Sequence, residues 1–499
     1  MSDAEFNIIN TKVGLVGGTV LLIGNVIAMT VFLMPAWLIA EDGVGPEIAL
    51  AMVAVSIPIT FSILGSLQVG GAMPAAGGSY VYASRLISPF FGFLLPWIVI
   101  PAIWFGQVFL ATGFAEFARV FVDLPLIVLM YMVMIPFILV NVFGIRVVAQ
   151  VQFLLVAIIV GGMLAFIVPG LFHIDTGTYT PMFQDGLGPF FVALVSLTIA
   201  MHGFGLATDL GEELKDPVKN IPRVLALSAV ISITLMVAVV VVAVGVVESL
   251  DFYVAEGTPP DAVPIEAGVA EAAGTFLPSY GYYLVALAAV VGAFTSLNTL
   301  YTAYSRQLMR AARDETIPLF FAKIHERYQS PYRSILLLGI PGLTLVPLAD
   351  PRTGEAIVSA LGLSSGAATY LHLDPVFLSV ALAATSLIGI VIASVALWNL
   401  PKRFPQRYEY SIYKLPMPLL KFVAVGGAII GIIFLVGVSA EYWWLTGGIL
   451  SWMALSYPAY RFRRWWLREK KGVDLAARMK DLHEYEQERA EAGSLEGEE

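Results

Sequence analysis

The chain has 499 residues, 58% of them hydrophobic and 13% charged, whereas a soluble domain averages roughly 25% charged residues. It contains no cysteine, so disulfides, thiol catalysis and thiolate metal sites are excluded. The net charge is −9. This composition excludes a soluble enzyme and predicts an all-α integral membrane protein.

Long runs without charge recur along the sequence. An apolar run of about 20 residues forms a helix that crosses the ~30 Å hydrocarbon core of a bilayer. We predict twelve transmembrane helices, at 13–40, 48–70, 89–115, 124–144, 147–171, 188–208, 224–247, 281–305, 334–349, 375–399, 419–439 and 442–460. The chain then divides into an N-terminus (1–12), a ten-span core (13–399), a two-span unit with its preceding loop (400–460) and a tail that is first basic and aromatic, then acidic (461–499).

The basic residues predict how the chain is oriented. With both termini in the cytoplasm, all of the 28 Lys and Arg residues except Arg119 and Arg352 fall on the cytoplasmic side of the predicted spans. Cytoplasmic loops of membrane proteins carry such an excess of positive charge. The sequence thus predicts a multi-pass protein of the cell membrane, in contact with the lipid bilayer, with both termini cytoplasmic.

The first span contains a stretch that favours an interrupted helix. Gly24 gives the backbone freedom, Asn25 can hydrogen-bond to nearby backbone, and Pro35 lacks a backbone donor. Freed backbone groups at this depth are tolerated where they are buried in protein or line a cavity. We therefore predict a cavity beside residues 23–35.

The second span leads into a turn that reads Pro-Ala-Ala-Gly-Gly-Ser-Tyr-Val-Tyr, residues 74–82. Proline and paired glycines redirect the backbone, and the aromatic residues hold the turn at the membrane face. We interpret this segment as a structural elbow.

The sixth span carries a second interruption, because Gly203 and Gly205 lie two residues apart near its end and loosen the helix. Spans one and six are five spans apart. This is the spacing expected if five spans repeat with inverted topology, which places a solute near the membrane midplane where the two broken helices meet.

Three motifs give the chain a specific resemblance. The elbow 74–82 matches a Pro-x-x-Gly-Gly-x-Tyr-x-Tyr signature, residues 212–223 match Glu-Glu-x-Lys-x-Pro-x-x-x-Ile-Pro-Arg, and residues 305–331 match the segment that follows an eighth span. On these residues the chain resembles the amino acid–polyamine–organocation (APC) transporter superfamily, which has the leucine-transporter fold. The resemblance implies a secondary active permease, not an enzyme, that works by alternating access through a 5+5 inverted repeat.

The sequence departs from that family at the expected site. The family's register places residues 28–30, Ala-Met-Thr, where its amino acid carriers have a turn of small residues. Gly205 replaces an acidic residue of span six, Ile159 a lysine of span five, and Gln68 an acidic residue before the elbow. A buried cation is costly without a carboxylate partner, and the spans supply none unless Asp209 reaches back. We therefore predict a neutral amino acid or a related small amine as substrate, rather than a polyamine.

Side chains near the two interruptions, with two from span three, form the predicted substrate site. Asn25 either caps the broken turn or binds the solute, and Phe204 either packs or closes over it. The predicted substrate-binding residues are Gly24, Asn25, Ala28, Met29, Thr30, Trp104, Gln107, Met201, His202, Gly203, Phe204 and Gly205.

Two kinds of ion coupling stay open. His202 either couples a proton to transport or is a neutral residue bonded between helices. The hydroxyl groups of Thr295, Ser296 and Thr299 either hold sodium together with carbonyl groups of span one or bond helix to helix. The sequence has no metal cluster, cofactor motif or nucleic-acid signature. Two alternatives are a non-transporting sensor of the same fold and a carrier of another organic solute.

Overall fold

The computed structural model of the protein describes residues 12–27, 29–200, 203–211, 213–253, 268–360, 373, 375–409, 411–441 and 443–480. The predictions for Ala28, Met201 and His202 lie outside these residues. The described chain is helical, and its extended backbone pairs at two isolated bridges, Val13 with Leu214 and Ala76 with Leu210.

The helices follow the charge-free runs of the sequence. The longer ones are α1 (Leu15–Val26), α2 (Thr30–Asp42), α3 (Ile48–Ala72), α5 (Pro89–Ala118), α6 (Leu126–Val142), α7 (Ile145–Gly170), α8 (Gly188–Ala200), α9 (Pro217–Gly245), α11 (Tyr280–Arg313), α12 (Tyr332–Ala349), α15 (Pro375–Arg403), α17 (Met417–Glu441) and α18 (Trp443–Lys471). The shorter ones are α4 (Gly78–Val81), η1 (Tyr82–Ile87), η2 (Thr176–Tyr179), η3 (Phe204–Asp209), η4 (Leu250–Tyr253), α10 (Val269–Phe276), η5 (Leu319–Ala322), α13 (Pro351–Ala360), α16 (Pro405–Glu409) and α19 (Leu475–Arg478).

Nine helices of the described chain are long and apolar enough to cross a membrane. They are Leu15–Ala36, Ile48–Ala72, Pro89–Ala118, Ile145–Gly170, Pro217–Gly245, Tyr280–Arg313, Tyr332–Ala349, Ala384–Arg403 and Met417–Gly437. Leu126–Val142 and Gly188–Thr198 are shorter apolar helices, and the last predicted span, 442–460, overlaps α18 from Trp443 onward. The protein is therefore a multi-pass membrane protein, while the twelve-span count and the inverted repeat stay predictions.

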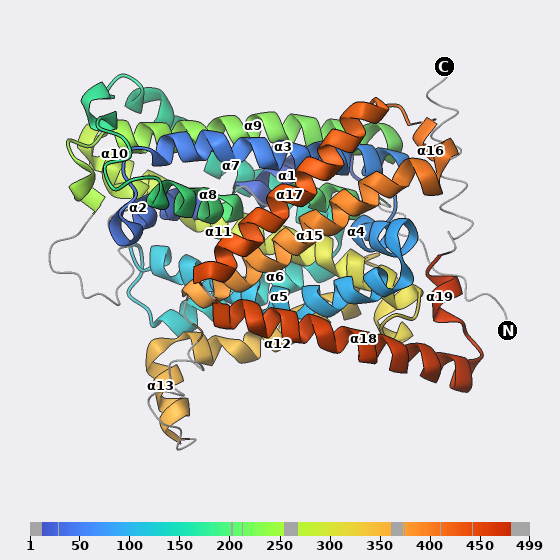
Figure 1. The fold of residues 1–499 in the computed structure, drawn as a ribbon. Coiled ribbons are helices and arrows are strands. Elements are labelled where there is room, and N and C mark those ends of the chain that lie inside the picture. Colours follow the sequence, from blue (N-terminus) through green and yellow to red (C-terminus); the bar gives the residue numbers. More distant parts are fainter. Residues whose placement is uncertain are drawn as a thin grey trace.

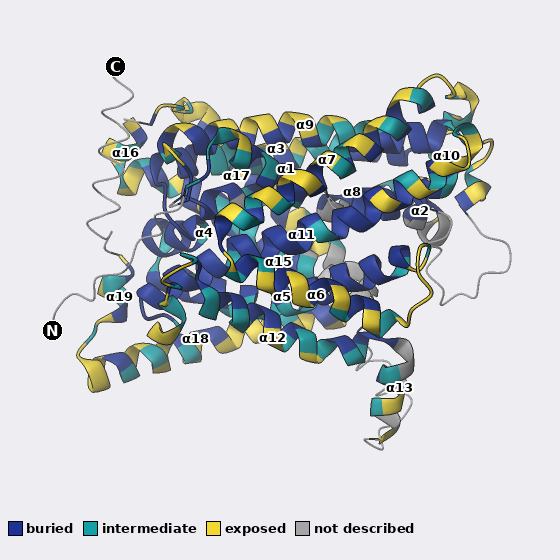
Figure 2. Ribbon diagram, turned by 180° about the vertical axis from the view of Figure 1, so that it is seen from behind, coloured by how far each residue is buried: buried dark blue, intermediate teal, exposed yellow. Residues whose placement is uncertain are grey.

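The bundle has two ends and an apolar outer surface. Figure 1 shows α4, α16 and α19 at one end and α2, α10 and α13 at the other. α11 is largely buried, and the helices around it carry more exposed residues (Figure 2). Phe153, Val230 and Ile433 are examples of large hydrophobic side chains that these outer helices expose. Exposed apolar side chains on long helices are expected where the surrounding solvent is lipid.

The first predicted span is divided into two helices, and a second division follows α8. α1 ends at Val26 and α2 begins at Thr30, while α8 ends before η3 begins at Phe204. Gly203, between α8 and η3, has φ +120°, a conformation that is accessible to glycine but not to a β-branched residue. Asn25 Nδ2 donates a hydrogen bond to the Gly203 carbonyl oxygen over 3.0 Å. This bond joins the two interruptions.

Three helices extend well beyond the spans that the charge pattern predicts. α18 runs to Lys471 rather than ending near 460. α9 begins at Pro217 rather than near 224, because proline fits the first turn of a helix, where its missing donor is not needed. α11 continues past 305 to Arg313, since Arg306 is fully buried and pairs with Glu213 through two bonds of 2.8 and 2.9 Å. A charge that marks a loop in the sequence here lies inside the bundle.

Candidate functional site

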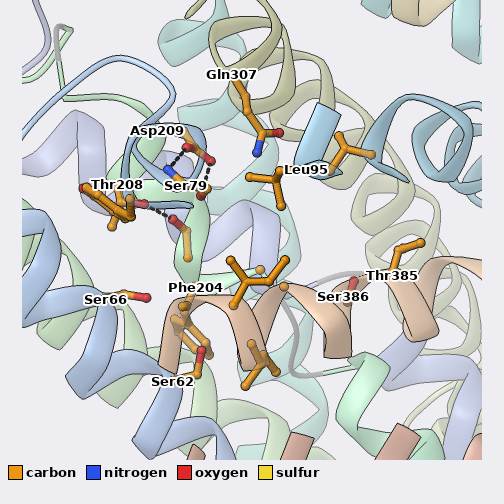
Figure 3. A pocket seen from close by; sticks show the side chains of 18 of the residues that line it. Ser62, Ser66, Ser79, Leu95, Phe204, Thr208, Asp209, Gln307, Thr385 and Ser386 are labelled. Atoms are coloured by element: carbon orange, nitrogen blue, oxygen red, sulfur yellow. Dashed lines mark hydrogen bonds between the residues drawn. The ribbon is translucent and has the colours of Figure 1, made fainter. Parts of the chain in front are cut away.

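A cavity of about 120 Å³ lies beside the second interruption (Figure 3). Its walls come from α3, α5, η3, α11 and α15, with contributions from α4 and η1. A single buried water needs roughly 10–15 Å³ by the same measure, so the cavity has room for a small organic solute.

The non-helical backbone at Gly203 and the short helix η3 form one wall. Gly203, Phe204, Gly205, Thr208 and Asp209 all line the cavity. Thr208 donates its hydroxyl hydrogen to the Gly205 carbonyl oxygen over 2.6 Å, which holds this wall in shape. Irregular backbone therefore lines a cavity here, the arrangement in which membrane proteins tolerate it.

Most of the cavity wall is apolar, and its polar groups are hydroxyls, one amide and one carboxyl. The apolar side chains include Ile59, Val69, Leu95, Val99, Ile103, Leu382, Ile390 and Ile392. The polar side chains are Ser62, Ser66, Ser79, Thr208, Asp209, Gln307, Thr385 and Ser386, with the tyrosines Tyr82 and Tyr304. The described lining contains no lysine, arginine or histidine.

Asp209 is the acidic group of this cavity. Its side chain is buried, with 1% of the residue exposed. Ser79 donates two hydrogen bonds to it, from the backbone N–H to Oδ1 over 2.9 Å and from the hydroxyl to Oδ2 over 3.2 Å. Burial disfavours a charged carboxyl group, whereas donated hydrogen bonds favour it.

The elbow holds this end of the cavity together. The Gly77 N–H donates to the Asp209 carbonyl oxygen over 3.0 Å, and Ser79 follows two residues later. Gly77 has φ +63°, and a Cβ atom there would lie 2.7 Å from Gln307 Cα on α11. The elbow thus needs glycine for both its left-handed backbone and its close approach to α11.

Gly77→Ala is expected to destabilise the protein more than Gly43→Ala. Both glycines are left-handed, with φ +63° and +60°, but a Cβ atom at Gly43 would meet nothing within 4 Å. The left-handed backbone costs alanine about 1–2 kcal/mol at either position. The additional loss of stability in Gly77→Ala over Gly43→Ala therefore measures the contact with α11. Thermal unfolding of the two purified variants in detergent tests this. Equal losses of stability would show that the elbow can move away from α11.

The residues predicted from the sequence divide into three groups. Gly203, Phe204 and Gly205 line the cavity. Gly24, Asn25, Met29, Thr30, Trp104 and Gln107 lie outside its lining, although Asn25 bonds to Gly203. Ala28, Met201 and His202 belong to the undescribed part of the chain.

The first-span residues outside the lining have packing roles. Gly24 lies within α1, and a Cβ atom there would lie 2.0 Å from Gln152 Nε2, so its small size lets α1 approach α7. Met29 is fully buried, with its side chain against Gly113. The Thr30 hydroxyl is buried and has no hydrogen-bond partner among the described residues.

Trp104 and Gln107 on α5 point to α12 rather than lining the cavity. Trp104 Nε1 donates to the Leu337 carbonyl oxygen over 3.1 Å. Gln107 Nε2 donates to the Leu338 carbonyl oxygen over 2.8 Å, and Gln107 Oε1 accepts from the Tyr301 hydroxyl. Both side chains therefore join α5 to neighbouring helices in this conformation.

The three hydroxyl residues of α11 lie against α1 and α7. Thr295 Oγ1 lies 3.5 Å from the Ile27 carbonyl oxygen and Thr299 Oγ1 3.4 Å from the Leu21 carbonyl oxygen, while Ser296 donates to its own helix over 3.0 Å. Gln152 Nε2 lies 3.2 Å from Thr299 Oγ1. A neutral amide donor thus occupies the space between these hydroxyls and α7. No group of three or more His, Asp or Glu residues in the described chain is arranged to hold a metal ion.

The sequence names Asp209 only as a carboxylate that could reach back to the site, and it does not indicate Gln307. Asp209 lies four residues after Gly205, about one helical turn, and this spacing was the available signal. Gln307 gave no signal, because it follows Arg306 in a segment that looks like a cytoplasmic loop.

Comparison with known proteins identifies the family. The model of the family described as "Amino acid permease" matches residues 13–442. An uncharacterized transporter of Mycobacterium bovis is 27% identical over 369 residues, which cover 71% of this chain and 76% of the relative. From Bacillus subtilis, the branched-chain amino acid permease BcaP is 22% identical over 364 residues (66% and 74%), and a methylthioribose transporter is 21% identical over 345 residues (64% and 71%). The chain belongs to the amino acid permease family.

Proposed function

We propose that this permease is a secondary carrier that moves a small organic solute across the membrane by alternating access. The observation that carries the proposal is the interrupted backbone at Gly203, which lines a cavity and is bonded to Asn25 at the other interruption. The interruption at Gly203 provides backbone groups for a solute in the cavity, and its bond to the first interruption links two points about which helices can move. Rocking of one set of helices against the other would open this cavity to each side of the membrane in turn.

The proposed substrate is a neutral amino acid or a related small amine. An apolar cavity with a few hydroxyl groups fits a small apolar body, and the relative BcaP carries the name of a branched-chain amino acid permease. A second candidate is an organic solute that is not an amino acid. The relative named as a methylthioribose transporter favours it, and the hydroxyl groups of the cavity suit a polar solute as well.

Transport is proposed to draw on a proton or sodium gradient or on exchange. His202 is the proposed proton-coupling residue, and Thr295, Ser296 and Thr299 are the proposed sodium site. Gln152 Nε2 donates to the Thr299 hydroxyl, so a neutral donor already occupies the position that a sodium ion would take. This contact favours a proton or exchange over sodium.

Counterflow in proteoliposomes tests the function. The purified protein is reconstituted in vesicles loaded with unlabelled amino acids or amines, and accumulation of each labelled compound is followed with and without proton and sodium gradients. The proposal predicts accumulation of at least one amino acid or small amine above empty vesicles. Specific binding without any exchange would support a sensor of the same fold instead.

A further inference from the structure

Asp209 and Gln307 place two hydrogen-bond acceptors at the same end of the cavity. Both residues line it, and each is 1% exposed. In Figure 3 the Gln307 side chain extends from α11 on the side where Asp209 meets Ser79, away from Ser62, with its amide nitrogen on the Asp209 side and its oxygen turned away. The elbow fixes this pairing, because Gly77 bonds to the Asp209 backbone and packs against Gln307 Cα.

Both residues have acceptor capacity left over. A carboxylate offers about four acceptor positions, and Ser79 fills two of them on Asp209. No lysine or arginine of the described chain forms an ion pair with Asp209. Gln307 Oε1 is buried and has no hydrogen-bond partner among the described residues. Buried acceptors of this kind are costly unless a donor satisfies them.

The rest of the lining is complementary to the body of an amine and not to an anion. Beyond this end the wall is built from aliphatic side chains of α3, α5 and α15 with scattered hydroxyls. The described lining offers a carboxyl group to a cation but no basic side chain to a carboxylate. An ammonium group has three donors and no acceptor. It matches the Asp209 carboxylate and, after a half-turn of the Gln307 terminal amide that exchanges its nitrogen and oxygen, an amide oxygen as well.

We propose that the Asp209–Gln307 end of the cavity binds the protonated primary amine of the solute. The proposal rests on the proposed function and deepens it, because it makes the amine the recognised group and the carboxylate dispensable. Apolar monoamines then belong to the substrate class together with amino acids. The single carboxyl group also explains why a second cationic group is unfavourable, since it would be buried without a partner.

The test uses three probes that share the isobutyl group, namely leucine, isoamylamine and 4-methylpentanoate. They carry an amine with a carboxylate, an amine alone and a carboxylate alone. Binding to the purified full-length protein in detergent is measured by titration calorimetry. Leucine and isoamylamine are expected to bind and 4-methylpentanoate is not. Binding of 4-methylpentanoate as tightly as isoamylamine, or no binding of either amine, would overturn the proposal. A binding signal from sodium chloride alone would also overturn it.

Asp209→Asn keeps the shape of the side chain and removes its charge. It is expected to weaken isoamylamine binding about 10- to 100-fold, the loss of one or two hydrogen bonds to a charged group. Asp350→Asn is the matched control, because Asp350 also accepts from the N–H and hydroxyl of one residue, Thr353, but lies outside the cavity lining. It is expected to leave the affinity unchanged. Unchanged affinity in Asp209→Asn contradicts the proposal.

Gln307→Met gives an independent test if the Asp209 variant does not fold. It removes one neutral acceptor at similar size and is expected to weaken isoamylamine binding about 2- to 10-fold, while unchanged affinity would contradict the role of Gln307. The experiments can contradict the proposed carrier function and the proposed amine site independently. Leucine counterflow without isoamylamine binding keeps the carrier and overturns the amine site, whereas isoamylamine binding without exchange of any compound keeps the amine site and overturns the carrier.

Discussion

Gly203→Val is expected to abolish uptake in proteoliposomes while the protein is still produced in the membrane. Gly203 has φ +120°, which valine cannot adopt without strain, and a Cβ atom there would lie 2.1 Å from Asn25 Nδ2. Valine must therefore displace Asn25 and reshape the backbone that lines the cavity. Because the bond from Asn25 to Gly203 joins the two interruptions, the substitution disturbs both the cavity wall and the point about which the helices are proposed to move.

Gly161→Val is the matched control for this experiment. Gly161 lies on the exposed face of α7, and a Cβ atom there would meet nothing within 4 Å. The same substitution in open space is expected to leave uptake near the wild-type rate. Size-exclusion chromatography of both variants separates loss of transport from loss of folding. Unimpaired uptake by a well-folded Gly203→Val protein would remove the interruption from the transport mechanism.

Glu213→Gln is expected to lower the free energy of unfolding by about 3–5 kcal/mol, the range found when one partner of a buried ion pair is removed. Arg306 and Glu213 have 0% and 1% exposed side chains and form two parallel hydrogen bonds. Neutralising Glu213 leaves the guanidinium group of Arg306 buried beside an uncharged amide. The loop that connects η3 to α9 should then separate from α11, and the thermal unfolding temperature in detergent should fall.

Glu409→Gln makes the same chemical change at an exposed pair. Glu409 pairs with Lys414, and their side chains are 60% and 38% exposed. Exposed ion pairs contribute about 0–1 kcal/mol, so this variant should unfold near the wild-type temperature. If Glu213→Gln were as stable as Glu409→Gln, the buried ion pair would not be the contact that holds the loop between η3 and α9 against α11.

The helices were largely predictable because the bilayer demands long apolar runs. Runs without charge gave the positions of α3, α5 and α17 to within a few residues, and the glycines near 203 indicated an interruption. The error at the start of α9 comes from Pro217, which fits the first turn of a helix, whereas the error at the end of α11 comes from a buried charge. Charge predicts exposure, but Arg306 is buried because Glu213, distant in sequence, neutralises it. Such pairing is a tertiary contact that no local pattern reports.

The cavity was only partly predictable for a similar reason. Gly203, Phe204 and Gly205 were found from local backbone chemistry, whereas Ser62, Gln307 and Ser386 reach the cavity from helices distant in sequence. Trp104 and Gln107 were predicted from spacing on one helix, yet their donors meet carbonyl groups of α12. Which face of a helix meets a cavity depends on how its neighbours pack, and a single sequence taken alone does not contain that information.

In the proposed mechanism the solute passes through the cavity between α3, α5, η3 and α15. The chain has no cysteine, so Ser386→Cys introduces one thiol into the cavity wall, and the unaltered protein treated in the same way is the control. A membrane-impermeant thiol reagent is applied to proteoliposomes, and counterflow of the transported compound is measured. We expect modification to block counterflow and the transported compound to slow modification. Full modification of this cysteine with undiminished counterflow would contradict the mechanism.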